Sequence, residues 1–203
     1  MGLMHGNRID GLTSDAPERV ARWTSAIGAV LALMAAPAHA QYELGVGVGI
    51  VAPLGNARQQ RSGKYEIGLT FIGPATGTIQ GRLDVYHFQF RGRLLQTPAG
   101  PLLASDLGVT SASIGLHFAE RGDTGPFLSI GFGLAGLALE GEANTETAPV
   151  TGAVLGTHTT LGSARIAVEF GGQIAFTQTG SGSNDTLGTL RWAFGRIRVA
   201  KLF

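Results

Sequence analysis

Large apolar residues recur at every second position along most of the chain after residue 41. In ELGVGVGIV they are Leu44, Val46, Val48 and Ile50, and glycines separate them. A period of two is that of a β-strand with one apolar face. The same alternation occurs in YEIGLTF, VYHFQFRGR, FLSIGFGLAG and RIAVEFGGQIAF, and more weakly in LGVTSASIGLHF and TGAVLGTHTTL. With the C-terminal segment, the pattern predicts about eight strands.

Polar turn segments separate the predicted strands, and longer and shorter ones alternate. The longer ones are NARQQRSGK, QTPAGPLLAS, EGEANTETAP and TQTGSGSND, and the shorter ones are GPATG, ERGDTG and LGSA. Outer-membrane barrels have this asymmetry, with short periplasmic turns and longer extracellular loops. An even number of strands places both termini on the periplasmic side.

The second face of each predicted strand carries mostly Gly, Ala, Ser and Thr, with few charges. A soluble sandwich would present a more polar face to water, whereas small residues suit the narrow interior of an eight-stranded barrel. The sequence therefore predicts an all-β fold, an eight-stranded antiparallel up-and-down transmembrane β-barrel whose large apolar residues face lipid. A soluble periplasmic, lipocalin-like binding protein is an alternative with the same alternation.

The N-terminus has the features of a secretory signal peptide. Residues 1–18 form a long polar n-region, Arg19 and Arg22 precede a short apolar stretch, and Ala38 and Ala40 flank His39 in the small-x-small pattern of a cleavage site. An uncleaved N-terminal anchor is the alternative. No other segment is long and apolar enough to cross a bilayer as a helix.

Composition narrows the class further. Charged residues make up 14% of the chain, well below the usual quarter or so. The net charge of +1 and the lack of a basic run argue against a nucleic-acid partner. Cysteine is absent, which excludes disulfides and thiolate metal sites. We therefore expect residues 1–40 to be a signal peptide and residues 41–203 to be an outer-membrane barrel domain.

The last predicted strand mixes arginines with apolar residues. Trp192 and Phe194 have one parity, whereas Ile197, Val199 and Phe203 have the other. A bulge near Gly195 would bring all five to the lipid side. The same bulge would turn three arginines inward: Arg191, Arg196 and Arg198. A lipid-facing arginine near the midplane costs about 2–4 kcal/mol, so the inward placement is preferred.

A terminal phenylalanine after an alternating strand resembles the C-terminal signal that the barrel assembly machinery reads. Phe203 matches it, Val199 and Ile197 match its outward apolar positions, and Lys201 departs from it. The chain from Gln41 to Phe203 thus resembles the small bacterial outer-membrane β-barrels, a class that includes the OmpA transmembrane domain and OmpX. The resemblance implies a bacterial outer-membrane location among outer-membrane lipids. It also implies the secretion apparatus and the barrel assembly machinery as partners during biogenesis.

On this parity the lumen holds a set of charged residues: Glu43, Glu66, Arg91, Glu169, Arg191, Arg196 and Arg198. Arg82 and Asp84 join the set if a second irregularity precedes Tyr86. Because buried charges persist only when paired, we expect a salt-bridge and hydrogen-bond network that fills the lumen. The protein would then have a structural role in the envelope, or a surface-interaction role through its four longer loops. Arginines outnumber carboxylates in the set, so a narrow anion-preferring pore is an alternative.

An enzyme is a further alternative, although we expect none. His158, Thr160 and Glu169 could supply a base, a hydroxyl nucleophile and an orienting acid. Their spacing resembles, loosely, that of outer-membrane lipid A deacylases, with Thr in place of Ser. The plainer interpretation is a hydroxyl-rich strand with one hydrogen-bonded histidine. His87 and His117 have no second ligand at metal spacing, so the sequence predicts no metal site and no cofactor.

Overall fold

The structure is a computed structural model in which six segments are described. They are residues 42–73, 78–98, 100–120, 122–141, 145–177 and 188–203. All of them belong to one compact unit, His39–Phe203. The predicted signal peptide, with Ala38 and Ala40, lies outside the described residues. Within these segments, no helix is long and apolar enough to cross a membrane.

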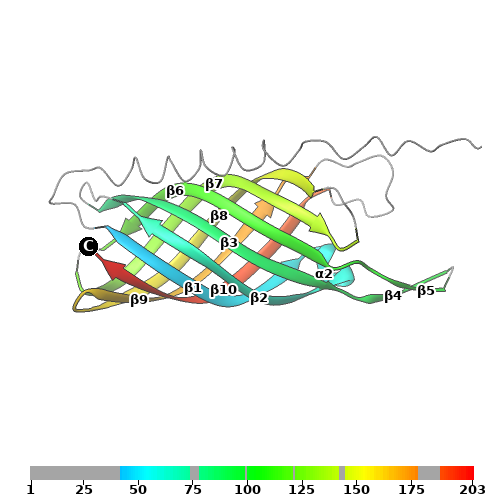
Figure 1. Cartoon of the computed structure of the whole chain (residues 1–203), viewed down its shortest axis with the longest axis horizontal. Helices are drawn as coiled ribbons and strands as arrows, with labels where there is room; N and C mark the ends of the chain where they lie inside the picture. The colour runs from blue at the N-terminus through cyan, green and yellow to red at the C-terminus, as the bar shows by residue number, and fades with distance from the viewer. Residues whose placement is uncertain (1–41, 74–77, 99, 121, 142–144, 178–187) are drawn as a thin grey trace, which may run out of the picture. The chain divides into compact units, whose positions relative to one another are not determined.

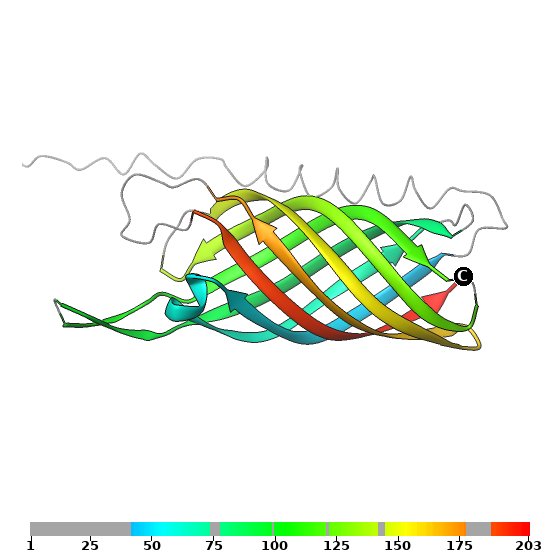
Figure 2. The ribbon, with the colours of Figure 1, turned by 180° about the vertical axis from the view of Figure 1, so that it is seen from behind.

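Eight antiparallel strands close into a barrel, as the sequence predicts (Figures 1 and 2). They are β1 (Glu43–Leu54), β2 (Arg61–Ile72), β3 (Ile79–Gly92), β6 (Leu107–Ala119), β7 (Thr124–Leu139), β8 (Thr145–Leu161), β9 (Ala164–Ala175) and β10 (Leu190–Leu202). Each strand pairs with its neighbours around the wall, and the last strand, β10, pairs with β1 over the full length of β1. Full closure leaves no barrel strand with an unpaired edge.

The two ends of the barrel differ. At one end Tyr42 N–H donates to the Phe203 carbonyl at 3.3 Å, and Phe203 N–H donates back at 2.9 Å; we call this the terminal end. At the other, the hairpin end, lie helix α2 (Ala57–Gln60) and a two-stranded hairpin of β4 (Leu94–Thr97) and β5 (Gly100–Leu103) (Figure 1).

Three of the predicted longer loops are more regular than the sequence indicates. The segment NARQQRSGK contains helix α2 and the first four residues of β2. The segment QTPAGPLLAS contains most of the β4–β5 hairpin, and residues 145–149 of the predicted loop EGEANTETAP belong to β8. The weaker segments LGVTSASIGLHF and TGAVLGTHTTL are confirmed as parts of β6 and β8.

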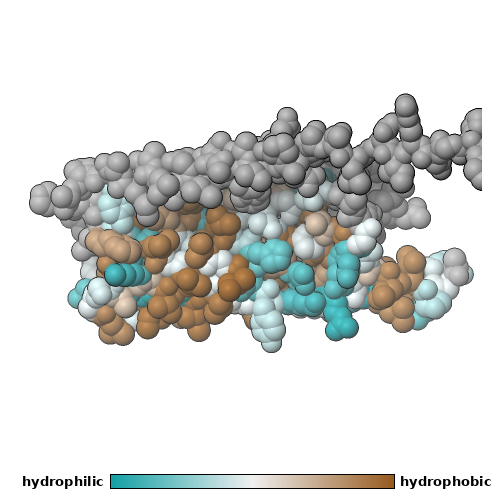
Figure 3. All heavy atoms as spheres, in the orientation of Figure 1, coloured by the Kyte–Doolittle hydropathy of each residue, from teal (hydrophilic) through white to brown (hydrophobic). Residues whose placement is uncertain are grey.

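The outer wall carries large apolar side chains that are mostly exposed. Phe132, Phe170 and Ile50 are 68%, 64% and 64% exposed, while the charged Glu169 and Arg198 inside are at most 1% exposed. Figure 3 shows the apolar residues covering much of one side of the wall, with polar residues gathered toward the hairpin end. An apolar exterior around a charged interior is the arrangement of a membrane-embedded barrel, and it is the reverse of a lipocalin-like cup.

The expected bulge near Gly195 is absent, and this prediction is wrong. The pairing of β10 with β1 and with β9 is unbroken over all of the paired residues. Trp192 and Phe194 therefore point inward together with the two arginines that follow them, and Arg191 is exposed on the outer wall.

The expected orientation of β3 is wrong in the same way. Its buried residues are Arg82, Asp84, Tyr86, Phe88 and Phe90, and its exposed ones include His87, Gln89 and Arg91. No irregularity is needed to bring Arg82 and Asp84 inside, because they share the parity of Tyr86. A bulge occurs instead in β2, where Lys64 and Tyr65 together lie opposite one residue of β3.

Glycines on the wall make room for these inward aromatic rings. Gly47 and Gly68 are directly opposite each other on β1 and β2, and a Cβ on either one would collide with the Tyr86 side chain. Gly171 and Gly156 leave space in the same way for Phe194 and Phe127. The rings thus lie against neighbouring strands at positions where no side chain competes for the volume.

Replacing Gly47 with alanine tests this packing. We expect Gly47→Ala to lower the free energy of unfolding by about 1–3 kcal/mol, because the added methyl group overpacks against Tyr86. Gly81→Ala is the matched control, since a Cβ there meets nothing within 4 Å, and it should stay within about 0.5 kcal/mol of the parent. Urea unfolding in detergent micelles measures both, and equal losses would contradict the proposed packing.

Candidate functional site

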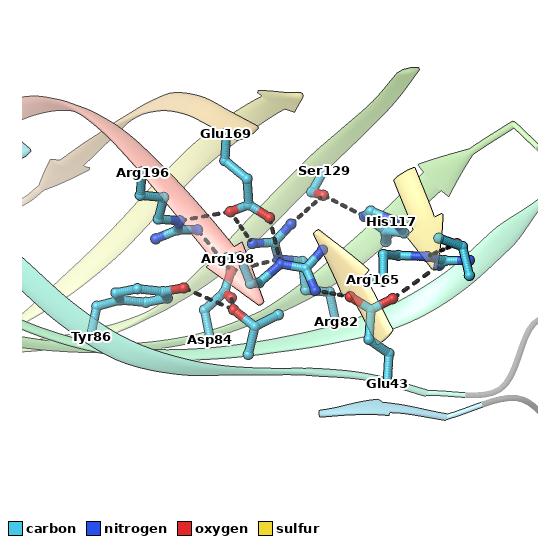
Figure 4. A network of polar contacts seen from close by, with 12 residues as sticks. Glu43, Arg82, Asp84, Tyr86, His117, Ser129, Arg165, Glu169, Arg196 and Arg198 are labelled. Carbon is cyan, nitrogen blue, oxygen red and sulfur yellow. Dashed lines mark hydrogen bonds and ion pairs between the residues drawn. The ribbon is translucent and has the colours of Figure 1, made fainter. Parts of the chain in front are cut away.

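Eight charged side chains of the described residues are linked to one another by ion pairs inside the barrel, and we call them the lumen network. Its members are Glu43 of β1, Glu66 of β2, Arg82 and Asp84 of β3, Arg165 and Glu169 of β9, and Arg196 and Arg198 of β10. Four arginines thus face four carboxylates. Figure 4 shows most of these side chains converging from opposite sides of the barrel.

Glu169 lies at the centre of the lumen network. Its Oε2 accepts from Arg196 Nε at 2.6 Å and from Arg82 Nη2 at 2.8 Å, and its Oε1 accepts from Arg198 Nε at 2.7 Å (Figure 4). Arg196 is directly opposite Glu169 in the pairing of β10 with β9. A carboxylate that accepts three charge-assisted hydrogen bonds compensates for the loss of its hydration, which a single partner would not achieve.

Arg196 also packs against two aromatic rings. Its guanidinium carbon lies 3.8 Å from the Tyr86 ring centroid and 4.4 Å from that of Phe194. Its terminal nitrogens lie 3.8 Å from Glu66 Oε1 and from Asp84 Oδ2. The cation is therefore held by ring faces as well as by carboxylates, which favours a fixed position.

A second set of pairs continues the network toward the terminal end. Glu43 forms ion pairs with Arg198 and with Arg165, the latter at 3.0 Å. Arg165 Nε also donates to Thr160 Oγ1 at 3.1 Å. The chain of contacts thus runs from Glu169 through Arg198 to the mouth of the barrel near Arg165.

Neutral side chains satisfy the remaining polar atoms on the β3 side. Thr70 Oγ1 donates to Asp84 Oδ1 at 2.6 Å and lies 3.0 Å from the Tyr86 hydroxyl. Arg82 Nε donates to Asp84 Oδ2 at 2.8 Å, and Arg82 Nη1 donates to Ser129 Oγ at 3.2 Å. A cavity of about 20 Å³ lies beside Arg82, which is room for about one water molecule.

The hairpin end of the lumen is filled by apolar side chains, which we call the apolar plug. Its members are Phe88, Phe90, Leu107, Leu190 and Trp192, none more than 2% exposed. The Phe88 ring lies 5.2 Å from that of Phe90 and 5.3 Å from that of Trp192, centroid to centroid. The lumen is thus filled at two levels, by the apolar plug and by the lumen network.

The predicted lumen residues divide into two groups. The structure places Glu43, Glu66, Glu169, Arg196 and Arg198 inside and brings them together. Arg91 and Arg191 are exposed on the outer wall instead, so their expected inward placement is corrected. The outward positions of Arg91 and Arg191 have the same cause: on β3 and β10 the aromatic residues face the interior, so the residues between them face outward.

Several residues of the lumen network, and several neutral side chains that bind it, were missed or only conditionally expected. Arg165, Thr70, Tyr86 and Ser129 gave no separate signal in the sequence. The pair Arg82 and Asp84 did give one, because two charges two positions apart share a strand face. That face would be inside in any membrane barrel, so the pair could have fixed the orientation of β3.

The three residues of the enzyme alternative, His158, Thr160 and Glu169, contact other residues in the structure. His158 lies beside the Phe127 ring, and its Nε2 donates to the Gly122 carbonyl at 3.4 Å. Thr160 accepts from Arg165, and Glu169 is held by three arginines. A nucleophile needs its base within hydrogen-bond reach; His158 bonds to Gly122 and Thr160 to Arg165 here, and the enzyme alternative stays a prediction.

Comparison with known proteins identifies the fold. No protein-family model matches the chain, and no curated protein sequence matches it. Among solved structures it is similar to Neisserial surface protein A, at 9% identity and a TM-score of 0.56, over 80% of this chain and 97% of that one. It is also similar to the outer membrane protein OprG from Pseudomonas aeruginosa, at 13% identity and a TM-score of 0.54, over 81% and 96% of the two chains. The chain folds as a small outer-membrane β-barrel.

Removing the central carboxylate tests the energetic weight of the lumen network. We expect Glu169→Gln to lower the free energy of unfolding by about 3–5 kcal/mol, because three buried arginines lose their shared counter-charge. Glu120→Gln, on an exposed residue near the terminal end, is the matched control and should stay within about 0.5 kcal/mol. Urea unfolding followed by Trp192 fluorescence measures both. A loss below 1 kcal/mol for Glu169→Gln would contradict the central role of this carboxylate.

Proposed function

We propose that this chain is an envelope protein of the bacterial outer membrane whose barrel does not conduct, and which acts through its outer wall and its hairpin end. The observation that carries the proposal is the double filling of the lumen. The apolar plug and the lumen network occupy the same passage in series, and a conducting pore needs a continuous path for hydrated ions.

The charge balance of the lumen argues against the pore alternative. An anion-preferring pore requires a surplus of positive charge along the passage. The lumen network has four arginines and four carboxylates, since Arg91 and Arg191 lie outside and Asp84 lies inside; Arg61, at the hairpin end of β2, is a further buried arginine. Each of its arginines forms an ion pair with at least one carboxylate, so little charge is left to attract an ion.

The β4–β5 hairpin supports a surface-interaction role. Leu94, Leu102 and Leu103 are exposed, and no charged residue occurs between Leu94 and Ser105. Because the termini of an outer-membrane barrel lie in the periplasm, the hairpin end would face the outside of the cell. An uncharged apolar hairpin in that position is suited to contact with another surface.

The residues of the expected assembly signal have a suitable placement. Ile197, Val199 and Phe203 are 53%, 53% and 63% exposed on the outer wall at or toward the terminal end. Their exposure supports the proposal that the barrel assembly machinery reads this strand during insertion. Lys201 lies close to Phe203, with its Nζ 5.1 Å from the ring centroid.

Cell fractionation tests the location and the closed barrel together. We expect the full chain to fractionate with outer membranes and to migrate faster in a gel without boiling than after boiling, because a closed barrel stays folded in mild detergent. Immunodetection in membrane and soluble periplasmic fractions measures this. Release with the soluble periplasmic proteins, with no shift on heating, would contradict the membrane proposal and favour a soluble β-cup.

Planar-bilayer recording tests whether the lumen conducts. We expect the folded protein to give no stable conductance steps, because the apolar plug and the lumen network block the passage. Arg198→Gln and Arg191→Gln make a matched pair, with one arginine in the lumen and the other outside. Regular steps in the parent protein whose size changes with Arg198→Gln, but not with Arg191→Gln, would overturn the proposal in favour of a narrow pore.

A further inference from the structure

A groove of about 730 Å³ opens on the outer wall of β1, β2 and β3, and we call it the wall groove. It is lined by Val48, Ile50, Lys64, Tyr65, Ile67, His87 and Gln89, among others. Its volume falls in the range of small-molecule sites. Glu66 and Phe88 also line it, although their side chains are buried, and its remaining side chains belong to the outer wall.

The β2 bulge shapes the wall groove. Lys64 and Tyr65 together lie opposite Gln89, so this part of β2 is one residue longer than its partner. Bulges bend a strand and redirect its side chains. Tyr65 is 82% exposed as a result, and it stands beside the groove with its ring directed away from the barrel.

One side of the wall groove is apolar. Val48 and Ile50 of β1 and Ile67 of β2 are each more than half exposed, and Val48 lies directly opposite Ile67. Side chains of this kind on the outer wall of a barrel face hydrocarbon. This side suits an acyl chain.

The other side is polar and positively charged toward the hairpin end. The outward residues of β3 change from Leu83 and Val85 to His87 and Gln89, which line the groove, and then to Arg91, the next outward residue beyond its lining. The Nδ1 atom of His87 is hydrogen-bonded to Thr110 Oγ1 at 2.9 Å. Among the described residues no hydrogen bond is made by its Nε2 atom, which is therefore available to a ligand. The Arg91 guanidinium forms no ion pair or hydrogen bond with any described residue.

Lys64 adds a second cation at the same height. Its Nζ lies 3.7 Å from Asp106 Oδ2, and Asp106 Oδ1 already accepts from Gly92 N–H at 2.7 Å. The carboxylate therefore only partly compensates Lys64, and Arg91 has no compensating carboxylate within the described residues. The polar side of the wall groove has a net positive charge.

We propose that the wall groove binds a phosphate-bearing lipid of the leaflet at the hairpin end. The acyl chain lies over Val48, Ile50 and Ile67, and the phosphate binds Arg91 with help from Lys64 and His87. We infer an anionic head group from the positive charge of these residues, because a cation at the membrane surface attracts anionic lipid. We infer that the ligand is a lipid because the groove lies on the outer wall, and the outer wall of a membrane barrel is surrounded by lipids. The inference rests on the proposed membrane location of the barrel.

Lipid binding to the folded, full-length barrel in detergent micelles tests the proposal by native mass spectrometry. The probes are bisphosphorylated lipid A and the same lipid with its phosphates removed. We expect the parent protein to bind the phosphorylated form at least about fivefold more tightly, which is the effect of about one cation near an anionic head group. Arg91→Gln should remove most of this preference. Arg191→Gln, an exposed arginine on β10 away from the groove, is the matched control and should preserve it.

A second pair of variants tests the apolar side. Ile67→Ser should weaken binding of both lipids, whereas Leu155→Ser, an equally outward residue on β8, should not. The proposal is overturned if the folded parent shows no phosphate preference, or if Arg191→Gln lowers the preference as much as Arg91→Gln. Loss of the heat-dependent gel shift in the parent would instead contradict the barrel, so the two failures are distinguishable.

Discussion

The width of the barrel limits everything placed inside it. Eight strands enclose a space just wide enough for side chains, so each large inward residue requires a small one nearby. The inward positions Gly45, Gly47 and Gly49 of β1 meet this requirement, because an added Cβ would collide with Ala200 at Gly45, with Tyr86 at Gly47, and with Gly195 and Arg196 at Gly49. The glycines of β1 and the large residues of β3 and β10 are therefore one arrangement, and neither would fit without the other.

The lumen network connects strands that are not neighbours in the wall. Glu169 of β9 binds Arg196 and Arg198 of the adjacent β10, and it also binds Arg82 of β3 across the lumen. A slip of one residue in any of these strands would exchange its two faces. Ionised side chains would then face lipid and large apolar ones would crowd the interior. The network and the apolar wall therefore favour the same register for independent reasons.

The sequence predicted the fold well because three patterns depend directly on the course of the backbone: the alternation of apolar residues, the spacing of the turns, and the strand faces made of small residues. It predicted the interior less well because hydrophobicity does not separate the faces of β3 and β10. The rings of Tyr86 and Trp192 are as apolar as lipid-facing residues, and their inward position depends on glycines of other strands. A pattern along one strand cannot show that an aromatic ring on it packs against a glycine on another strand. Glu43, Glu66 and Glu169 were placed inside correctly, since their strands have large aliphatic residues on the opposite face.

The orientation of β3 and β10 also decides which charges can meet a ligand. With an inverted β3 and the bulged β10 predicted from the sequence, Arg91 and Arg191 would join Arg196 and Arg198 in the lumen and give it a positive surplus, and an anion pore would be reasonable. In the structure, the four arginines of the lumen network are matched by its four carboxylates, and Arg91 is exposed on the wall without a partner in the described chain. Buried charges that are fully paired stabilise an arrangement but have no capacity left for a ligand. The positive charge that is available for recognition therefore lies on the outer wall, at the height where the apolar surface ends.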